Sequence, residues 1–373
     1  MANSLIKLIS SLMGRINSTI FHRNLNSAVK LNERKVNLIL GSVSMLSSKP
    51  KEFEYISKYF SKSRLPDSYL GIGDDCSAVP WGPENYLIQS TDQMVEGVHF
   101  LLDKITPWQL GWKSLAVSLS DIAAMGGSPM GAYLNLALPQ ELGEDFLAEF
   151  SKGFFALADS LDLPLLGGDT TASPGPLFVA TTVQGQCREM KRRSDVKPGD
   201  LAVVCGCVGD SHIGLSLVLG DISPFEGGQY FLKRHLEPEP LLAQGQWLAG
   251  QSAVHGMMDI SDGIACDVTH LCHQSGVGVR IDVSKIPLSE PAKGFFKNSS
   301  KEIIQTILSG GEDYGLLLSV DGKQWSRLVQ DFEGQFSQPL RVVGEFTQSK
   351  AISFENNGVL IENPETFKHF KND

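Results

Sequence analysis

Acidic residues recur beside glycine, at points where apolar, strand-like segments of this 373-residue chain end. In α/β folds, the loops that follow strand ends are where ligands bind. Each acid alone could be an ordinary turn or capping residue, because turns favour Asp and Gly. Their joint recurrence instead predicts one site that is built from several strand ends. These acids are Asp74 and Asp75 in GIGDDC, Asp92 in STD, Asp169 in GGDTT, Asp259 and Asp262 in DISDG, and Glu312 and Asp313 in GGED.

One further acid, Asp121, lies inside a predicted helix over residues 107–125. Thr106 suits the N-cap of this helix, Pro107 suits its first position, and a Gly-Gly pair follows its end. Apolar residues between Trp108 and Ile122 recur at helical spacing, and Asp121 flanks this apolar stripe. An aspartate in such surroundings is costly unless it is paired or bound to a cation.

Hard carboxylate ligands without His or Cys select Mg²⁺, which in proteins commonly bridges a few carboxylates to substrate phosphates. The set of acids therefore predicts Mg²⁺ and a phosphorylated ligand. The sequence contains no P-loop, no kinase HRD and DFG pair, and no GxGxxG that opens a helix. Gly206 and Gly209 precede a predicted helix and could either bind an anion or allow close packing.

Strand-like and helix-like segments alternate from Phe53 onward, which predicts an α/β or α+β fold in two halves. The polar, basic segment Arg188–Asp200 is the predicted hinge between them. Besides residues 107–125, helices are predicted over Glu54–Ser61, Glu144–Leu161, from about Ser211, and from Ile264 through Leu271. Strands are predicted over Tyr86–Thr91 ending at Asp92, Tyr133–Leu138, Leu163–Leu166 ending in GGDTT, Leu177–Gln184, Leu201–Cys205, Met257–Ile260 and Tyr314–Val320.

The first 50 residues contain Lys and Arg but no acid before Glu33. This composition resembles an organellar transit peptide, and a disordered extension or a later start at Met45 are the alternatives. We predict a disordered extension over residues 1–52, an N-terminal domain over 53–188 and a C-terminal domain over 189–373. The predicted location is cytoplasmic, with organellar targeting as the lesser alternative.

Composition excludes several classes of partner. The net charge of −10 and the lack of a Lys/Arg block argue against nucleic acid. The uncharged apolar run from Val36 to Leu46 is too short to span a bilayer. Six cysteines without a C-x-x-C pair predict reduced thiols in a cytosol, not a disulfide framework or a zinc site.

From about Phe53 to the C-terminus, the chain resembles the thiamine-monophosphate kinases, a family in the superfamily of aminoimidazole ribonucleotide synthetase. The resemblance implies ATP- and Mg²⁺-dependent phosphorylation of thiamine monophosphate to thiamine diphosphate by direct transfer. It also implies a homodimer, in which the N-terminal α/β domain pairs strands across the interface and is followed by a C-terminal α+β domain. The motifs that carry it are GIGDDC (71–76), STDQMVEGVHF (90–100), AVSLSDIAAMG (116–126), GGDTT (167–171), DISDG (259–263) and SGGEDY (309–314).

The resemblance assigns roles to individual residues, and Asp121 would bridge several ions. Implied Mg²⁺ ligands are Asp75, Ser90, Thr91, Asp92, Asp121, Asp169, Asp259 and Asp262. Implied ATP contacts are Gly168, Asp169, Arg193 and Ser261, and implied substrate contacts are His99, Glu312 and, by a loose local match, Phe367. Gly315 departs from the family, which commonly has Glu there. No covalent catalytic residue is predicted, because neither Ser-His-Asp nor Cys-His spacing is found.

Two other functions stay open. One is a different activity of the superfamily, such as ATP-dependent ring closure or selenide phosphorylation. The latter would use a reactive cysteine in the N-terminal segment, and residues 1–52 contain none. The other is a non-catalytic metal or nucleotide sensor, which would tolerate the loss of some acids, although none is missing here.

Overall fold

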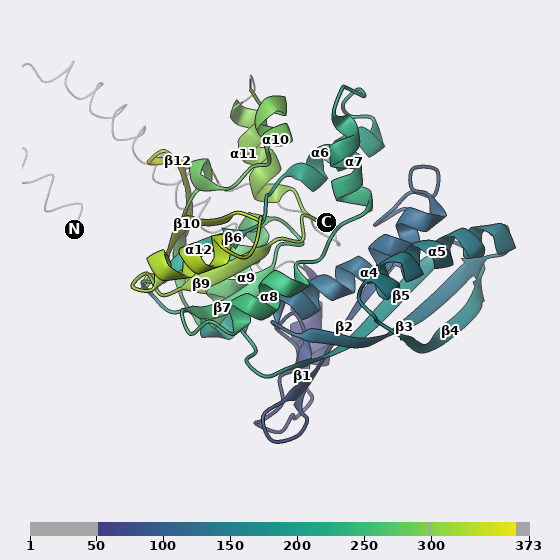
Figure 1. The fold of residues 1–373 in the computed structure, drawn as a ribbon, viewed down its shortest axis with the longest axis horizontal. Helices are drawn as coiled ribbons and strands as arrows, with labels where there is room; N and C mark the ends of the chain where they lie inside the picture. The colour runs from purple at the N-terminus through teal and green to yellow at the C-terminus, as the bar shows by residue number, and fades with distance from the viewer. Residues whose placement is uncertain (1–50, 298–299, 363–373) are drawn as a thin grey trace, which may run out of the picture. The chain divides into compact units, whose positions relative to one another are not determined.

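Two β-sheets, each covered by helices, make up the part of the chain that the computed structural model describes, residues 51–297 and 300–362 (Figure 1). The predicted disorder of the extension up to residue 50, and the substrate contact at Phe367, lie outside the described residues. No described helix has the length and apolar character needed to cross a membrane. All six cysteines are free thiols, as predicted.

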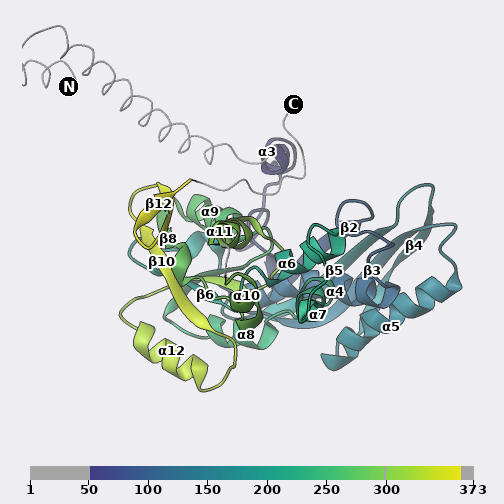
Figure 2. The ribbon, with the colours of Figure 1, turned by 90° about the horizontal axis from the view of Figure 1, so that it is seen from above.

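The first sheet has the strand order β1-β2-β5-β3-β4, with antiparallel pairs except for the parallel pair β3–β4. Helix α4 packs on β2 and β5, and α5 packs along α4 (Figures 1 and 2). The N-terminal elements are α3 (Lys51–Tyr55), η1 (Ile56–Phe60), β1 (Ser77–Pro80), β2 (Tyr86–Val95), α4 (Pro107–Ala124), β3 (Ser128–Pro139), α5 (Glu144–Ser160), β4 (Leu165–Ser173) and β5 (Phe178–Cys187).

The second sheet has the order β12-β11-β8-β10-β6-β9-β7, and its central strands β6 and β9 are almost fully buried. Its strands are β6 (Leu201–Cys205), β7 (Val254–Asp259), β8 (Gly278–Asp282), β9 (Leu316–Val320), β10 (Leu340–Thr347), β11 (Ile352–Asn356) and β12 (Val359–Ile361). Its helices are η2 (Arg193–Asp195), α6 (Asp210–Leu219), α7 (Gly228–Leu236), α8 (Leu242–Ala249), α9 (Ile264–Ser275), η3 (Val283–Lys285), α10 (Glu290–Phe295), α11 (Ser300–Ser309) and α12 (Trp325–Glu333).

Helix α4 begins and ends where the sequence predicts. The Thr106 hydroxyl accepts a hydrogen bond from the Gln109 N–H at 3.2 Å, and Gln109 Oε1 accepts one from the Thr106 N–H at 3.2 Å. This reciprocal capping box satisfies backbone donors that would otherwise lack partners. The chain leaves the helix through Gly126, whose φ of +71° favours glycine. Because α4 is buried along most of its length, its polar side chains lie inside the protein.

Several predicted strand limits are wrong. Strand β3 begins at Ser128 instead of Tyr133, and β5 runs to Cys187 instead of Gln184. Two further errors bear on the site. Strand β2 continues past Asp92 to Val95, because residues 93–95 go on pairing with β5, so Asp92 lies within a strand. The GGDTT segment is not a loop but the middle of β4, which pairs with β3 along its length. A Cβ at Gly168 would meet the Leu134 carbonyl oxygen at 1.7 Å, so this glycine permits close approach of two strands instead of a turn.

The segment predicted as a hinge, Arg188–Asp200, is anchored where it passes helix α9. The Ser275 hydroxyl donates to the Arg193 carbonyl at 2.7 Å and accepts from the Val196 N–H at 3.1 Å. These contacts fix the short helix η2 against the second sheet's helices. They set the position of Arg193, which the resemblance implies is an ATP contact.

Candidate functional site

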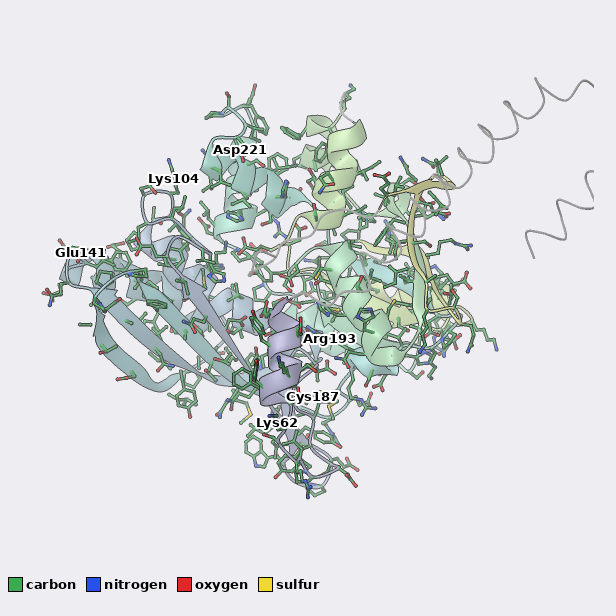
Figure 3. All side chains as sticks on the ribbon, turned by 180° about the vertical axis from the view of Figure 1, so that it is seen from behind. Lys62, Lys104, Glu141, Cys187, Arg193 and Asp221 are labelled. Atoms are coloured by element: carbon green, nitrogen blue, oxygen red, sulfur yellow. The ribbon has the colours of Figure 1, made fainter. Side chains whose placement is uncertain are left out.

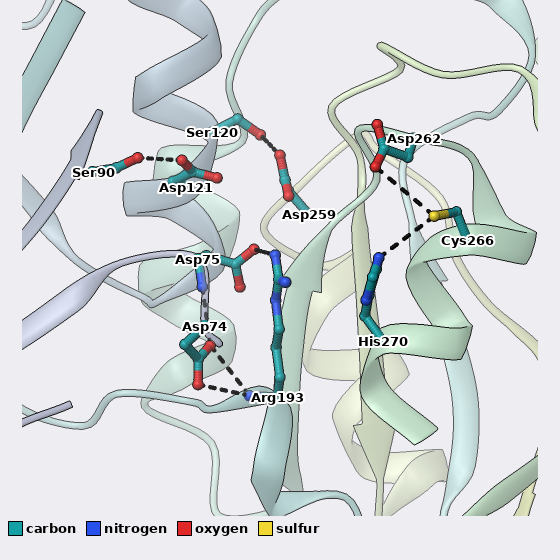
Figure 4. Close-up of polar contacts among 10 residues, drawn as sticks. All are labelled: Asp74, Asp75, Ser90, Ser120, Asp121, Arg193, Asp259, Asp262, Cys266 and His270. Carbon is teal, nitrogen blue, oxygen red and sulfur yellow. Dashed lines mark hydrogen bonds and ion pairs between the residues drawn. The ribbon is translucent and has the colours of Figure 1, made fainter. Parts of the chain in front are cut away.

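Three carboxylates from separate parts of the chain meet in what we call the carboxylate cluster: Asp75, Asp121 and Asp259. One oxygen from each lies within 4.8 Å of the others (Figure 4). Asp75 lies in the loop before β1, Asp121 in α4 and Asp259 at the end of β7. The first two belong to the half that carries the first sheet, and the third belongs to the half that carries the second. The sequence prediction that these acids share a site is consistent with this geometry.

Hydroxyl and guanidinium donors hold the three carboxylates in place. The Ser90 hydroxyl donates to Asp121, and the Ser120 hydroxyl donates to Asp259 Oδ2 at 2.7 Å. Arg193 Nη2 donates to Asp75 Oδ1 at 2.5 Å. Ser120 and Asp259 come from the two different halves, so their hydrogen bond crosses between the two sheets. Each carboxylate thus keeps at least one oxygen directed by a neighbour (Figure 4).

The electrostatics of the cluster favour a bound cation. Desolvation raises the pKa of Asp121 well above its usual range, and the charges of Asp92 and Asp259 raise it further. Desolvation, with the charge of Asp75, raises the pKa of Asp259 to about 8. One buried oxygen of Asp75 and one of Asp92 have no hydrogen-bond partner. Adjacent buried carboxylates can ionise together only if a cation compensates them, and an all-oxygen set suits Mg²⁺.

Arg193 provides positive charge beside the cluster, where the N-terminal and C-terminal elements meet (Figure 3). Desolvation works against its charge, but Asp75 and Asp259 more than compensate and raise the pKa of Arg193 above its usual value. Its buried Nε has no hydrogen-bond partner. A charged guanidinium with an unused donor is suited to a phosphate oxygen.

Asp74 has a different role from its neighbour Asp75. Its carboxylate accepts backbone hydrogen bonds from Asp75 at 3.2 Å and from Arg193 at 3.2 Å. These bonds tie the GIGDDC loop to η2. Desolvation and the charge of Asp75 raise the pKa of Asp74 to about 7. Asp74 therefore positions two residues of the site and is not itself in the carboxylate cluster.

Other residues implied by the resemblance are not members of the carboxylate cluster. Thr91 is exposed, and its hydroxyl pairs with that of Thr182 at 2.9 Å. The Ser261 carbonyl accepts a hydrogen bond from the Glu312 N–H at 2.7 Å. Asp262 lies beside Cys266 and His270, in a second group of possible metal ligands (Figure 4).

Gly168 and Asp169 lie on the exposed edge strand β4. Asp92 on β2 pairs with Thr181 on β5, Thr181 pairs with Leu134 on β3, and Leu134 pairs with Gly168 on β4. These four residues form one row across the first sheet. Three strand spacings separate the ends of this row, or about 14 Å. Within one chain, Asp169 and the carboxylate cluster therefore cannot bind the same ion.

The predicted substrate contacts His99 and Glu312 lie close enough to interact electrostatically. Glu312 accepts from Lys113 Nζ at 3.1 Å, and His235 Nδ1 lies 3.2 Å from the same oxygen. Desolvation acts to raise the pKa of Glu312, but the charge and the hydrogen bond of Lys113 hold it below its usual value. Desolvation and Lys113 lower the pKa of His235 to about 3. Glu312 is therefore an anion beside a neutral imidazole.

Sequence reasoning missed Lys113, Ser120 and His235. Lys113 is a charged residue in the same apolar helix as Asp121, so the argument that singled out Asp121 could also have found it. Ser120 and His235 carry no comparable local signal, because their roles depend on residues far along the chain.

The anion site considered at Gly206 and Gly209 is filled from within the protein. The Gly209 N–H donates to Asp313 Oδ2 at 2.7 Å, and the Ser211 N–H donates to Asp313 Oδ1 at 3.1 Å. Desolvation raises the pKa of Asp313 to about 7, although these two donors lower it. The start of α6 thus binds a carboxylate of the chain itself.

The fold and the carboxylate cluster place the chain among the AIR synthase related proteins. The model of their N-terminal domain matches residues 73–187, and the model of their C-terminal domain matches residues 197–355. The thiamine-monophosphate kinase of Salmonella typhimurium is 37% identical over 318 residues, which cover 83% of this chain and 94% of that protein. The chain belongs to the thiamine-monophosphate kinase family, which confirms the resemblance and the two-domain mixed α/β fold.

Two further comparisons agree. The thiamine-monophosphate kinase of Bacillus subtilis is 33% identical over 310 residues, covering 81% of this chain and 94% of that protein. Among solved structures, AaThiL complexed with AMPPCP and TMP has a TM-score of 0.74 at 28% identity, covering 87% of this chain and 99% of that chain. The relatives are therefore matched over nearly their whole length.

Proposed function

We propose that this chain transfers the γ-phosphoryl group of ATP to thiamine monophosphate, giving thiamine diphosphate and ADP. The observation that carries the proposal is the approach of Asp75, Asp121 and Asp259 to within 4.8 Å. This arrangement is found in a chain that belongs to a family of kinases. The complex of AaThiL with AMPPCP and TMP supports ATP and thiamine monophosphate as the two substrates.

Mg²⁺ is part of the proposal. Asp75, Asp121 and Asp259 would hold it, with Asp92 and Ser90 alongside. When bound, Mg²⁺ would neutralise charge on the phosphates of ATP and of the acceptor. The orphaned buried oxygens of Asp75 and Asp92 support this assignment, because a cation would satisfy them.

The chain's own residues bind and orient the reactants. Arg193 would bind a phosphate oxygen through its unused Nε donor, while Asp74 fixes its backbone. Ser90 and Ser120 direct two of the carboxylates. The acceptor is an ionised phosphate oxygen, which is already nucleophilic, so neither a general base nor a covalent intermediate is required.

At the acceptor end, Glu312 and His99 would contact thiamine monophosphate. The thiazolium ring of the substrate is cationic, and Glu312 is held as an anion by Lys113. An ionised carboxylate stabilises such a ring by charge attraction. We also retain Phe367 as a predicted substrate contact.

A homodimer would explain the position of Asp169. Strand β4 is an edge strand, exposed along nearly all its length, and an unpaired edge can bind a second chain. Asp169 lies too far from the carboxylate cluster of its own chain to share an ion with it. We propose that Gly168 and Asp169 serve ATP in the site of the partner subunit.

The remaining expectations stay predictions: domains over 53–188 and 189–373, an extension over residues 1–52 and a cytoplasmic location. A fusion of residues 1–52 to a fluorescent reporter tests the location. Diffuse cytoplasmic signal is expected, and accumulation in an organelle would support the targeting alternative.

One assay tests the proposed function. The purified chain is incubated with ATP, Mg²⁺ and thiamine monophosphate, and thiamine diphosphate and ADP are separated and quantified. Equal amounts of both products are expected, and only when all three components are present. Hydrolysis of ATP without thiamine diphosphate would favour another activity of the superfamily. Binding of ATP without turnover would favour the sensor.

A further inference from the structure

Three side chains of different chemistry meet at the start of helix α9. Cys266 Sγ lies 3.8 Å from Asp262 Oδ2 and 3.5 Å from His270 Nε2 (Figure 4). One possible ligand atom from each residue lies within 4.8 Å of the other two. The spacing of four residues brings Cys266 and His270 to the same face of the helix, below the loop that carries Asp262.

These separations match the edges of a tetrahedral zinc site. A zinc ion binds sulfur at about 2.3 Å and nitrogen or oxygen at about 2.0–2.2 Å, so tetrahedral angles put sulfur about 3.6 Å from each of the other two atoms. A thiolate, an imidazole and a carboxylate select soft or borderline cations such as Zn²⁺ over Mg²⁺. The group thus differs in chemistry from the all-oxygen carboxylate cluster.

A buried carboxylate with an unpartnered oxygen lies next to Cys266 in the chain. Asp267 is 1% exposed, and its Oδ2 has no hydrogen-bond partner. Asp267 also follows Cys266 directly in α9. Negative groups are therefore concentrated here in low-dielectric surroundings.

We propose that Asp262, Cys266 and His270 form a binding site for one divalent cation of the Zn²⁺ class, and that filling this site inhibits phosphoryl transfer. Binding forms a bond between the metal and sulfur, and the thiol proton passes to the buffer. Inhibition follows because Asp262 is also a predicted Mg²⁺ ligand, so the two metals compete for one carboxylate. The inhibition rests on the proposed function, whereas metal binding does not. The sequence analysis predicted no zinc site, because it looked only for C-x-x-C pairs of cysteines.

Cobalt(II) tests the binding directly, because a thiolate ligand gives it a charge-transfer band in the near ultraviolet. Titration of the purified chain without Mg²⁺ or ATP is expected to produce this band and to saturate at one equivalent. The band should be lost in C266S and weakened in H270Q. It should persist in C272S, which removes another buried cysteine of the same helix and is the matched control.

The cobalt titration can also contradict the proposed site. A wild-type chain without the band, a band that persists in C266S, or one that disappears in C272S would overturn it. Circular dichroism checks that each variant is folded, and H270Q gives a second reading if C266S is not. Retained intensity in H270Q would exclude the imidazole as a ligand and overturn the site as stated.

Inhibition is measured separately, with Zn²⁺ added at fixed Mg²⁺ and ATP. We expect half-inhibition of C266S, relative to its own zinc-free rate, to need at least about tenfold more Zn²⁺ than that of the wild type, because a thiolate ligand is lost. Equal sensitivity of the two chains would overturn the inhibitory role. If the wild type does not phosphorylate thiamine monophosphate, the proposed function fails, while the cobalt band still decides whether the site exists.

Discussion

Lys113 Nζ lies 3.1 Å from Glu312 Oε2 and joins helix α4 to the segment that leads into β9, 199 residues later in the chain. The lysine side chain is 1% exposed. Glu312 has a φ of +63°, in the left-handed region that non-glycine residues rarely adopt. The ion pair holds the Glu312 carboxylate in its ionised form.

Replacing Lys113 by Met should weaken both the fold and substrate binding. Removing one partner of a fully buried ion pair costs about 3–5 kcal/mol of the free energy of unfolding, because the other charge loses its compensation. The cost here should fall below that range, because the Glu312 side chain is 29% exposed and water can solvate it. The KM for thiamine monophosphate should rise more than the KM for ATP. Denaturant unfolding and steady-state kinetics measure the two effects. K113R should recover part of both, and equal changes in the two KM values would contradict a role at the acceptor end.

Replacing Asp121 by Ala should abolish turnover without unfolding the protein. The loss in kcat should be at least about a hundredfold, as for other single groups that organise charge in an active site. Without metal, the variant should unfold at a higher temperature than the wild type, because repulsion with Asp92 and Asp259 is removed. D159A, which removes an exposed aspartate of α5, is the control. A near-native rate for D121A would show that the carboxylate cluster is not the metal site.

Stability without metal should fall as the pH rises from about 4 to about 8. The pKa of Asp259 is about 8 in the folded chain, whereas an unfolded aspartate has a pKa near 3.9. The folded state therefore holds more protons than the unfolded state in this window, and a higher pH favours unfolding. Mg²⁺ should reverse the trend and raise the melting temperature more at pH 8 than at pH 5. D259N should show a smaller slope; an unchanged slope would exclude Asp259 as its cause.

Mixed dimers test whether Asp169 acts across subunits. D121A and D169A chains should each be inactive alone. Co-expressed in equal amounts, they should recover about a quarter of the wild-type activity, because half of the dimers are mixed and each mixed dimer has one intact site. Persistent inactivity of the mixture would place Asp169 in the site of its own chain. Light scattering establishes in parallel that the chain is a dimer.

The sequence predicted correctly those structural features that depend on residues close together in the chain. The limits of α4 follow from a capping box and a glycine within a few residues of its ends. The ends of β2 and β4 were wrong because strand length depends on partners far along the chain. The free-energy cost of burying Asp121 can be read from the apolar residues around it in the same helix, so the sequence could predict that Asp121 belongs to the site. Its neighbours Ser120 and Asp259 meet only through tertiary packing, so no sequence pattern indicated their hydrogen bond.

The carboxylate cluster takes Asp75 and Asp121 from one half of the chain and Asp259 from the other. A cation bound there would join the halves, in addition to the hydrogen bond between Ser120 and Asp259. By thermodynamic linkage, a bound cation strengthens the association of the two halves by the same factor by which their association strengthens cation binding. Any mutation that loosens the contact between the two sheets will therefore act as a metal-affinity mutation, even when it lies far from every ligand.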